Sequence, residues 1–315
     1  MAERDAVERL DAVVESVLAG RATASIDPDI AMLAAVAVDL RDLPDPNFKS
    51  RLRRELMPAV ETRPVDATPQ IGTIRPYLLV DDGDAMLRFL QDAFDAEVLG
   101  AYRRPNGTLM HGEVRIGDSI LELAQANEQW EKVDMAIHLY VDNADAVLER
   151  AVRAGAKILR PIVDQFYGDR EATIIDLSGN HWYIATHLAT HGKRPGYGSI
   201  TPFIHVRGTD RLIDFLKDAL GAEEAYERYT TPEGLIAHAA LRVGESLVEF
   251  GEGPGDWKPL NGHIHVFVKD PDALFERAVK AGAKVLYPMA DQPYGERGGG
   301  VTDPFGNHWY IATPK

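Results

Sequence analysis

A long internal repeat constrains this chain more than any other feature of its sequence. The segment from Ile137 to Arg170 returns from Ile264 to Arg297 with an offset of 127 residues, and the match continues to Thr186 and Thr313. About 28 of the 49 positions from His138 to Thr186 are identical to their counterparts. This similarity indicates a duplication, so the two halves must share one fold.

Earlier segments of the two halves also match, although more weakly. TIRPYLLV at Thr73 aligns with SITPFIHV at Ser199, and HGEVRIGDSILEL at His111 aligns with HAALRVGESLVEF at His238. The two units therefore cover residues 71–190 and 197–315, and we interpret the polar, glycine-rich HGKRPGYGS between them as a linker.

Within each unit the hydrophobic pattern predicts one order of elements that occurs twice: a strand, a helix, then two or three strands. Because helices cover one face of so short a sheet, two units together are expected to leave a curved sheet with a hollow face. The fold class is therefore α+β. The expected elements of the first unit are strands at 73–80, 111–116, 119–124, 136–141, 172–176 and 181–186 and helices at 84–94 and 144–154.

Residues 1–65 have a different character. Helical periodicity at 3–18, 28–40 and 47–57 predicts three short helices, separated by proline-containing breaks. We interpret them as a small N-terminal helical segment that packs on the body or forms a homodimer, with regulated partner binding as the alternative.

Composition excludes several classes of function. With 34 Lys and Arg against 49 Asp and Glu, the net charge of −15 argues against nucleic acid and anionic membranes as partners. The absence of cysteine excludes disulfides, thiolate metal sites and thiol nucleophiles. The chain has neither a signal-like start nor an apolar run of about 18 residues, so we expect a cytoplasmic protein with a small-molecule partner.

The endings DQFYGDREATIIDLSGNHWYIAT and DQPYGERGGGVTDPFGNHWYIAT point to a known family. With PYLLV and PFIHV at the front of each unit, the chain resembles the glyoxalase, bleomycin resistance and extradiol dioxygenase superfamily, also called vicinal oxygen chelate, and most of all its PhnB-like branch. The resemblance covers about 245 of 315 residues. It implies tandem glyoxalase-like domains built of paired βαβββ modules, but it leaves function open because the superfamily includes enzymes and non-catalytic drug sequestrants.

The resemblance also implies a divalent metal, Zn, Ni, Mn or Fe, held by the first, fourth, fifth and eighth strands. Mixing the two domains, as paired modules of this family often do, projects those positions onto either of two sets, neither of which supplies four good ligands. A displaced site from His205, Glu249 and His138 is one alternative, and a polar cavity without a metal is the interpretation we prefer. The two sets are Arg75, Glu122, His263 and Tyr310, or Thr201, Glu249, Ala136 and Tyr183; the candidate metal ligands are His205, Glu249 and His263.

Four side chains are the candidate catalytic residues. A neutral imidazole on an inward strand face, opposite a carboxylate, can act as a general base near neutral pH. His138 and His265 are the imidazoles, and Glu122 and Glu249 are their candidate partners.

Aromatic and arginine side chains near the same strands are the candidate substrate-binding residues. For the arginines of the two YG-D/E-R motifs the alternative is a turn held by an ion pair with a carboxylate. The candidates are Arg75, Tyr77, Tyr167, Arg170, Tyr183, Phe203, Tyr294, Arg297 and Tyr310.

The leading hypothesis is a two-domain protein that binds a small organic molecule, with acid/base isomerase or lyase chemistry. A metal-dependent glyoxalase or dioxygenase is one alternative, and sequestration of a toxic compound without conversion is the other. We expect Trp182 and Trp309, which alternate with the inward-facing tyrosines, to lie in the core.

Overall fold

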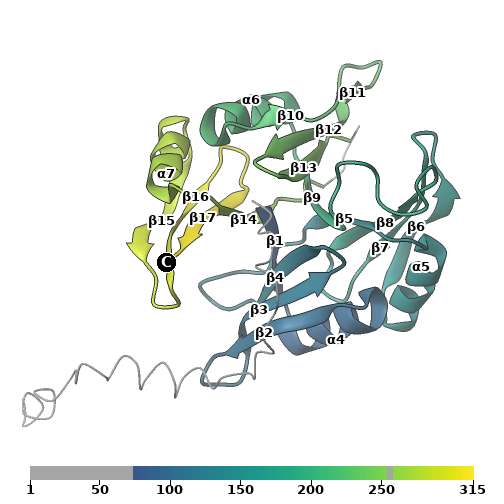
Figure 1. The fold of residues 1–315 in the computed structure, drawn as a ribbon, viewed down its shortest axis with the longest axis horizontal. Helices are drawn as coiled ribbons and strands as arrows, with labels where there is room; N and C mark the ends of the chain where they lie inside the picture. Colours follow the sequence, from purple (N-terminus) through teal and green to yellow (C-terminus); the bar gives the residue numbers. More distant parts are fainter. Residues whose placement is uncertain (1–73, 254–257) are drawn as a thin grey trace, which may run out of the picture. The chain divides into compact units, whose positions relative to one another are not determined.

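The computed structural model describes residues 74–253 and 258–315, and the three helices expected within residues 1–65 lie outside the described residues. The described part has an α+β fold, as the sequence predicts (Figure 1). Its helices are α4 (Gly83–Phe94), α5 (Ala144–Arg153), α6 (Thr209–Leu220) and α7 (Pro271–Lys280). The strands of the first repeat are β1 (Ile74–Val80), β2 (Glu97–Arg103), β3 (Leu109–Ile116), β4 (Ser119–Gln125), β5 (Ala136–Tyr140), β6 (Lys157–Asp164), β7 (Asp169–Ile175) and β8 (His181–His187). Those of the second repeat are β9 (Ile200–His205), β10 (Glu223–Glu224), β11 (Tyr229–Thr230), β12 (Ile236–Val243), β13 (Ser246–Gly251), β14 (His263–Phe267), β15 (Lys284–Asp291), β16 (Glu296–Thr302) and β17 (His308–Pro314).

Capping residues mark the ends of several helices. The carboxylate of Asp82 accepts hydrogen bonds from two backbone N–H groups at the start of α4, and the side-chain oxygens of Asn143 and Asp270 each accept one at the start of α5 and α7. Gly155, in a left-handed conformation at φ 105°, follows the end of α5. These caps fix the register of the apolar face that each helix buries.

The two sheets exchange strands between the repeats. One sheet has the order β15-β16-β17-β14-β1-β4-β3-β2, and the other has the order β10-β12-β13-β9-β5-β8-β7-β6. The repeats meet where β1 pairs antiparallel with β14 and β5 pairs antiparallel with β9. Each sheet therefore combines the first half of one repeat with the second half of the other, which is the mixed arrangement considered for the metal positions.

Each repeat nevertheless keeps a hydrophobic core of its own. In the first repeat, α4 packs beside α5, and in the second α6 packs beside α7 (Figure 1). The buried apolar side chains beneath each helix pair come from the same repeat except for Ile200 in the first core and Ile74 in the second. Trp182 and Trp309 lie in these two cores with 0% and 1% of their surface exposed, which confirms their predicted core position. Because the helices cover one face of each sheet, the other face is left to build a site.

The strands that the sequence pattern did not place are peripheral. β2 and β6 form sheet edges, and β6 is exposed at seven of its eight positions, so it lacks the alternation that identifies a half-buried strand. Among the helices of residues 74–253 and 258–315, none has the length and apolar character that crossing a membrane requires.

Candidate functional site

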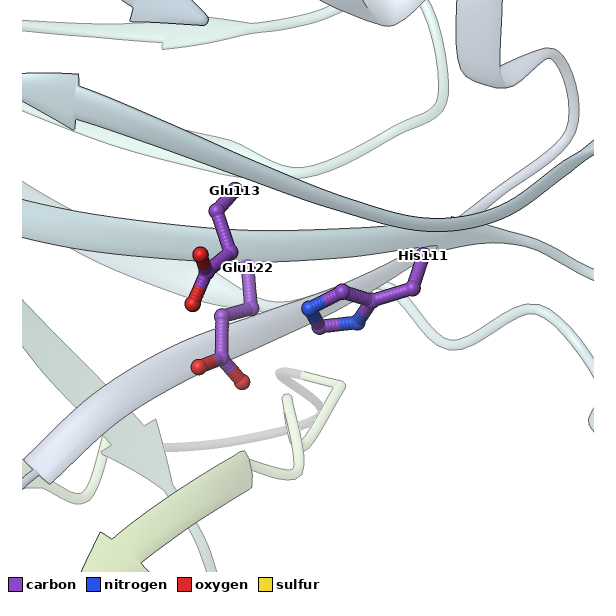
Figure 2. A group of neighbouring side chains, drawn as sticks. All are labelled: His111, Glu113 and Glu122. Carbon is purple, nitrogen blue, oxygen red and sulfur yellow. The ribbon is translucent and has the colours of Figure 1, made fainter. Parts of the chain in front are cut away.

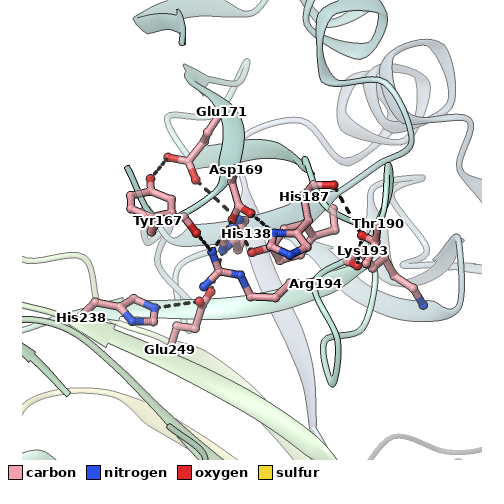
Figure 3. Close-up of polar contacts among 11 residues, drawn as sticks. His138, Tyr167, Asp169, Glu171, His187, Thr190, Lys193, Arg194, His238 and Glu249 are labelled. Carbon is pink, nitrogen blue, oxygen red and sulfur yellow. Dashed lines mark hydrogen bonds and ion pairs between the residues drawn. The ribbon is translucent and has the colours of Figure 1, made fainter. Parts of the chain in front are cut away.

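A buried histidine and a buried glutamate form the centre of the nine-stranded sheet. His138 comes from β5 and Glu249 from β13, and β9 lies between them, with Phe203 paired to both Ala136 and Glu249. Nδ1 of His138 donates a hydrogen bond to Oε2 of Glu249 at 2.9 Å, and Nε2 of His238 lies 2.9 Å from the other carboxylate oxygen (Figure 3). Both oxygens of Glu249 are thus held by imidazoles.

These contacts set the charges of the pair. Burial opposes ionisation of Glu249, but the neighbouring His138 and the hydrogen bonds from His138 and His238 outweigh it, so the pKa of Glu249 lies far below its usual range. Burial likewise lowers the pKa of His138, yet the charge of Glu249 prevails and the pKa is raised above 6.5. Glu249 is therefore an anion that stabilises the imidazolium form of His138.

A cavity of about 870 Å³ opens in front of this pair. Several Phe and Tyr side chains contribute to its wall, which suits a planar or apolar ligand, and its polar lining includes His138, Glu171 and Glu249. The aromatic lining residues are Tyr140, Phe166, Tyr167, Tyr183, Tyr197, Phe203, Tyr226 and Tyr229.

The ring of His138 forms part of the cavity wall, and its second nitrogen is buried. Within the described residues, Nε2 of His138 has no hydrogen-bond partner, although the ring is almost fully buried and lines the cavity. Oε2 of Glu171 lies 3.5 Å away, which is too long for a good hydrogen bond. Buried polar atoms are normally paired, so this nitrogen is suited to act on a ligand.

Strand β7 supplies two further carboxylates close to His138. Asp169 is fully buried and accepts hydrogen bonds from Tyr140 Oη at 2.7 Å, His187 Nδ1 at 2.6 Å and Arg194 Nη2 at 3.1 Å (Figure 3). Glu171 accepts a hydrogen bond from Tyr167 Oη at 3.1 Å. Asp169 is thus neutralised by its neighbours, whereas Glu171 has a phenol as its main partner.

The eight-stranded sheet carries the counterpart pair. Nδ1 of His265 on β14 lies 2.8 Å from Oε2 of Glu122 on β4. Here a guanidinium is added: Nη1 of Arg75 lies 2.9 Å from Oε1 of Glu122 and 2.8 Å from Oε1 of Glu113. Figure 2 shows Glu113 and Glu122 side by side on neighbouring strands with His111 beside them.

The side chains at the metal positions projected from the family do not fit a divalent cation in either sheet. In the eight-stranded sheet, Arg75 already supplies positive charge to Glu122. In the nine-stranded sheet, Thr201 and Ala136 offer no strong ligand, and both oxygens of Glu249 are engaged.

Within residues 74–253 and 258–315, two further groups have three potential ligand atoms within 4.8 Å of one another. In the group of His111, Glu113 and Glu122, Arg75 binds both carboxylates. In the group of His138, Asp169 and Glu171, the oxygens of Asp169 are occupied by Tyr140, His187 and Arg194. In both groups an arginine thus competes with a metal ion for the carboxylates.

The structure separates the three candidate metal ligands named from the sequence. His205 on β9 and Glu249 on β13 line the same cavity, whereas His263 on β14 belongs to the eight-stranded sheet. Nε2 of His205 lies 3.0 Å from Tyr183 Oη, and burial lowers the pKa of His205 to about 4, so this histidine is neutral. Nδ1 of His263 lies 3.0 Å from Tyr310 Oη.

The candidate substrate-binding residues divide into three groups. Tyr167, Tyr183 and Phe203 line the described cavity. Four others belong to the eight-stranded sheet or its connections; among them, Oη of Tyr77 lies 3.2 Å from His111 and its ring is 5.6 Å from that of Tyr310. These four are Arg75, Tyr77, Tyr294 and Tyr310.

The third group contains the arginines of the YG-D/E-R motifs, whose observed contacts match the alternative interpretation of a turn held by ion pairs. Arg170 binds Asp145 and Asp164, with Nε 2.6 Å from Asp145 Oδ2. Arg297 binds Asp272 and Asp291 in the same way. Each arginine thus joins the start of a helix to the hairpin of its own half-repeat, and neither lines the cavity.

Several residues of this site were not found from the sequence. Asp169 and Glu171 alternate on β7, which signals one face of a strand, but the sequence alone shows Asp169 only as a member of the YG-D/E-R motif. Arg194 and Tyr197 belong to HGKRPGYGS, which the sequence predicts to be a linker, yet both line the cavity, and Nη2 of Arg194 binds Asp169. Only the tertiary structure brings that linker to the site.

Comparison with known proteins agrees with this architecture. The family model described as the Glyoxalase/Bleomycin resistance protein/Dioxygenase superfamily matches residues 70–184 and 198–311. The chain belongs to this superfamily. As a member of the glyoxalase superfamily it carries two tandem family segments, while its assignment to the PhnB-like branch stays a prediction.

Individual relatives of this glyoxalase-superfamily chain match different portions of it. It is 37% identical over 127 residues to the uncharacterized protein Mb0911c of Mycobacterium bovis, an alignment that covers 37% of this chain and 83% of the relative. Among solved structures, glyoxalase I from Zea mays superposes with a TM-score of 0.60 at 17% identity, covering 76% of this chain and 92% of the maize protein. At that identity the likeness concerns the fold alone.

Proposed function

We propose that the chain binds a small organic molecule in the cavity of the nine-stranded sheet and transfers a proton on it through His138. The observation that carries the proposal is the state of the His138 ring, which lines the cavity and is held by Glu249 through Nδ1, while its buried Nε2 has no hydrogen-bond partner among the described residues. A histidine oriented by a carboxylate in this way is suited to general acid/base chemistry.

The proposed reaction uses only side chains of this chain. In its neutral form, His138 would take a proton at Nε2 from an acidic C–H or O–H group of the ligand, and Glu249 would stabilise the resulting imidazolium. Returning that proton to another atom gives an isomerisation, and returning it to a leaving group gives a lyase reaction. Burial raises the pKa of Tyr183 to about 12, so its hydroxyl stays protonated and can donate to a developing oxyanion.

Sequestration without conversion is the second candidate, because an aromatic wall can hold a planar ligand without any chemistry. A metal-dependent glyoxalase or dioxygenase reaction has less support, since Arg75 binds Glu122 and the donor set in the other sheet is incomplete. The protein as a whole would then act on, or capture, an organic compound of moderate size.

The test begins with a thermal-shift screen of the full chain against a library of small organic molecules. Each ligand found is incubated with the protein in D₂O and followed by ¹H NMR. We expect deuterium incorporation or conversion by the wild type, reduced about 100-fold or more in His138→Gln, and unchanged in the control His308→Gln, which lies in the other sheet. A ligand that binds tightly and is returned without exchange supports sequestration and overturns proton transfer.

A further inference from the structure

Among the described residues that line the cavity, Glu171 is the buried carboxylate with the weakest charge compensation, because the only basic group near it is the His138 ring that Glu249 already engages. Asp169 is bound by Arg194 and His187, and Glu249 is bound by His138 and His238. Within the described chain, no lysine or arginine forms an ion pair with Glu171, which has only the Tyr167 hydroxyl at 3.1 Å and the ring of His138 at 3.5 Å. A buried carboxylate with so little compensation is costly to the fold.

The fold itself does not require a carboxylate at this position. The counterpart of Glu171 in the second repeat is Gly298, which lies on the equivalent strand β16 of the other sheet. Burial raises the pKa of Glu171, and the negative charges of Asp169 and Glu249 add to that effect although His138 opposes it. A positive charge placed beside Glu171 would relieve both the burial and the repulsion.

The atoms around Glu171 suit a group with several N–H donors. Oε2 of Glu171 and Nε2 of His138 are 3.5 Å apart, both residues line the cavity, and the buried Nε2 has no hydrogen-bond partner among the described residues. In the imidazolium form that Glu249 stabilises, Nε2 carries a proton, so binding of an ammonium group here requires His138 to release that proton. In the resulting neutral form, both atoms accept hydrogen bonds. An alkylammonium group has three donors and the charge that the carboxylate lacks.

The entrance to the cavity adds aromatic faces. Phe166 is 81% exposed and Tyr229 is 53% exposed, and their ring centroids lie 5.7 Å apart although they come from different repeats. Tyr167, which binds Glu171, packs edge-on against Phe166 at 5.1 Å. Aromatic faces attract organic cations and also bury the apolar part of such a ligand.

The charge of the cavity points the same way. Among its described lining residues, six carboxylates stand against three Lys or Arg side chains, namely Asp134, Asp169, Glu171, Glu227, Glu249 and Glu252 against Arg160, Arg194 and Lys258. Together with the net charge of −15 for the chain, this favours entry of cations over anions.

We propose that Glu171 is an ammonium-binding residue and that the ligand of this cavity is an organic amine carrying an aromatic or apolar group. The inference rests on the proposed function only in that it concerns the same cavity. It adds the chemical class of the ligand and the residue that selects it.

The test compares three probes of matched shape by isothermal titration calorimetry with the full chain: 2-phenylethylamine, the neutral 2-phenylethanol and the anionic phenylacetate. We expect the amine to bind at least about tenfold more tightly than the alcohol, and phenylacetate to bind most weakly. Glu171→Gln, which keeps size and shape, is expected to remove the preference for the amine while leaving affinity for the alcohol unchanged. The matched control is Glu149→Gln, an exposed glutamate on α5 that does not line the cavity.

Equal binding of amine and alcohol, tighter binding of phenylacetate, or no effect of Glu171→Gln on the amine overturns the inference. If the alcohol binds but the amine gains nothing, the cavity is a ligand site and only the amine preference fails. If none of the three probes binds, the amine inference fails, and the library screen with deuterium exchange decides the proposed function separately. Circular dichroism melts of each variant verify that the fold is intact.

Discussion

His138 and Glu249 lie in different repeats, yet Nδ1 of the histidine is 2.9 Å from Oε2 of the glutamate. Their counterparts 127 residues away make the reciprocal contact, because His265 of the second repeat binds Glu122 of the first. The exchange follows from the strand order, in which each sheet takes half of its strands from each repeat. Neither repeat alone can therefore build either His–Glu pair.

Removing one member of the buried pair should weaken the fold strongly. Glu249 is 1% exposed, so Glu249→Gln removes the charge that balances His138 at a site where water cannot replace it. We expect the free energy of unfolding to fall by about 3 kcal/mol, measured by urea denaturation monitored by circular dichroism. Glu97→Gln is the control, because its ion pair with Arg115 is exposed and should contribute less than about 1 kcal/mol.

A loss in Glu249→Gln no larger than that of the control would contradict the pairing. It would mean that His138 is satisfied without the carboxylate.

The contribution of this pair should depend on pH in a defined direction. The pKa of Glu249 is lowered on folding, so its stabilising effect is present above the ordinary value of 4.5 and is lost as the pH falls further through the lowered pKa. The pKa of His138 is raised, so its effect is full below 6.5 and disappears as the pH rises through the raised pKa. The two effects overlap fully between pH 4.5 and 6.5.

We therefore expect the difference in melting temperature between wild type and Glu249→Gln to be largest in that interval and to shrink above it. The measurement is a series of thermal melts of both proteins across pH. A difference that grows steadily toward alkaline pH would show that His138 is not the group that Glu249 stabilises.

Much of the fold could be predicted because the repeat shows every pattern twice. Alternating apolar residues identify β1 and β4, and helical periodicity with a capping glycine identifies α5. The sequence pattern does not predict the edge strand β6, because its side chains are mostly exposed and do not alternate between buried and exposed positions. The hydrophobic pattern predicts that each repeat contains two groups of strands. It does not predict that each group joins a group of the other repeat in one sheet, because that pairing depends on tertiary contacts.

The site was less accessible to sequence reasoning. His138, His265 and the glutamates at 122 and 249 are predicted as candidate residues because they are polar residues on otherwise apolar strands. The structure brings each histidine together with one glutamate. Arg194 lies in a linker whose composition gives no hint that it would reach Asp169. Likewise, the hydrophobic pattern of the sequence does not predict that Arg75 binds both Glu113 and Glu122.

The aspartates in the two GNHW hairpins should be structural. Asp176 accepts hydrogen bonds from the indole N–H of Trp182 at 2.9 Å and from Asn180, and Asp303 does the same for Trp309 and Asn307. Replacing either aspartate with alanine leaves buried donors unpaired, so we expect each variant to lose about 3 kcal/mol of unfolding free energy. The exposed Asp214→Ala on α6 should change it by less than about 0.5 kcal/mol in urea denaturation. Unequal losses, with one aspartate replaceable at no cost, would contradict an equivalent role in the two repeats.

We predict that the guanidinium of Arg75 occupies the position that a metal ion would otherwise take in the eight-stranded sheet. Its guanidinium binds Glu122, which is 1% exposed, and Glu113, so Arg75→Gln leaves two neighbouring carboxylates without their shared charge. We expect the free energy of unfolding to fall by about 3 kcal/mol. Because His111 and both glutamates have ligand atoms within 4.8 Å of one another, added Zn²⁺ or Mn²⁺ should restore part of the lost stability in this variant.

The measurement is the melting temperature of each protein with metal and with EDTA. Wild type should not respond, since a guanidinium already neutralises the site, and Arg75→Gln combined with Glu122→Gln should lose the response because a ligand is gone. Ligand binding in the nine-stranded cavity should stay unchanged in Arg75→Gln, because Arg75 does not line that cavity. Stabilisation of the wild type by the same metal, abolished by Glu122→Gln, would instead mean that the guanidinium gives way to an ion and that this sheet holds a metal site.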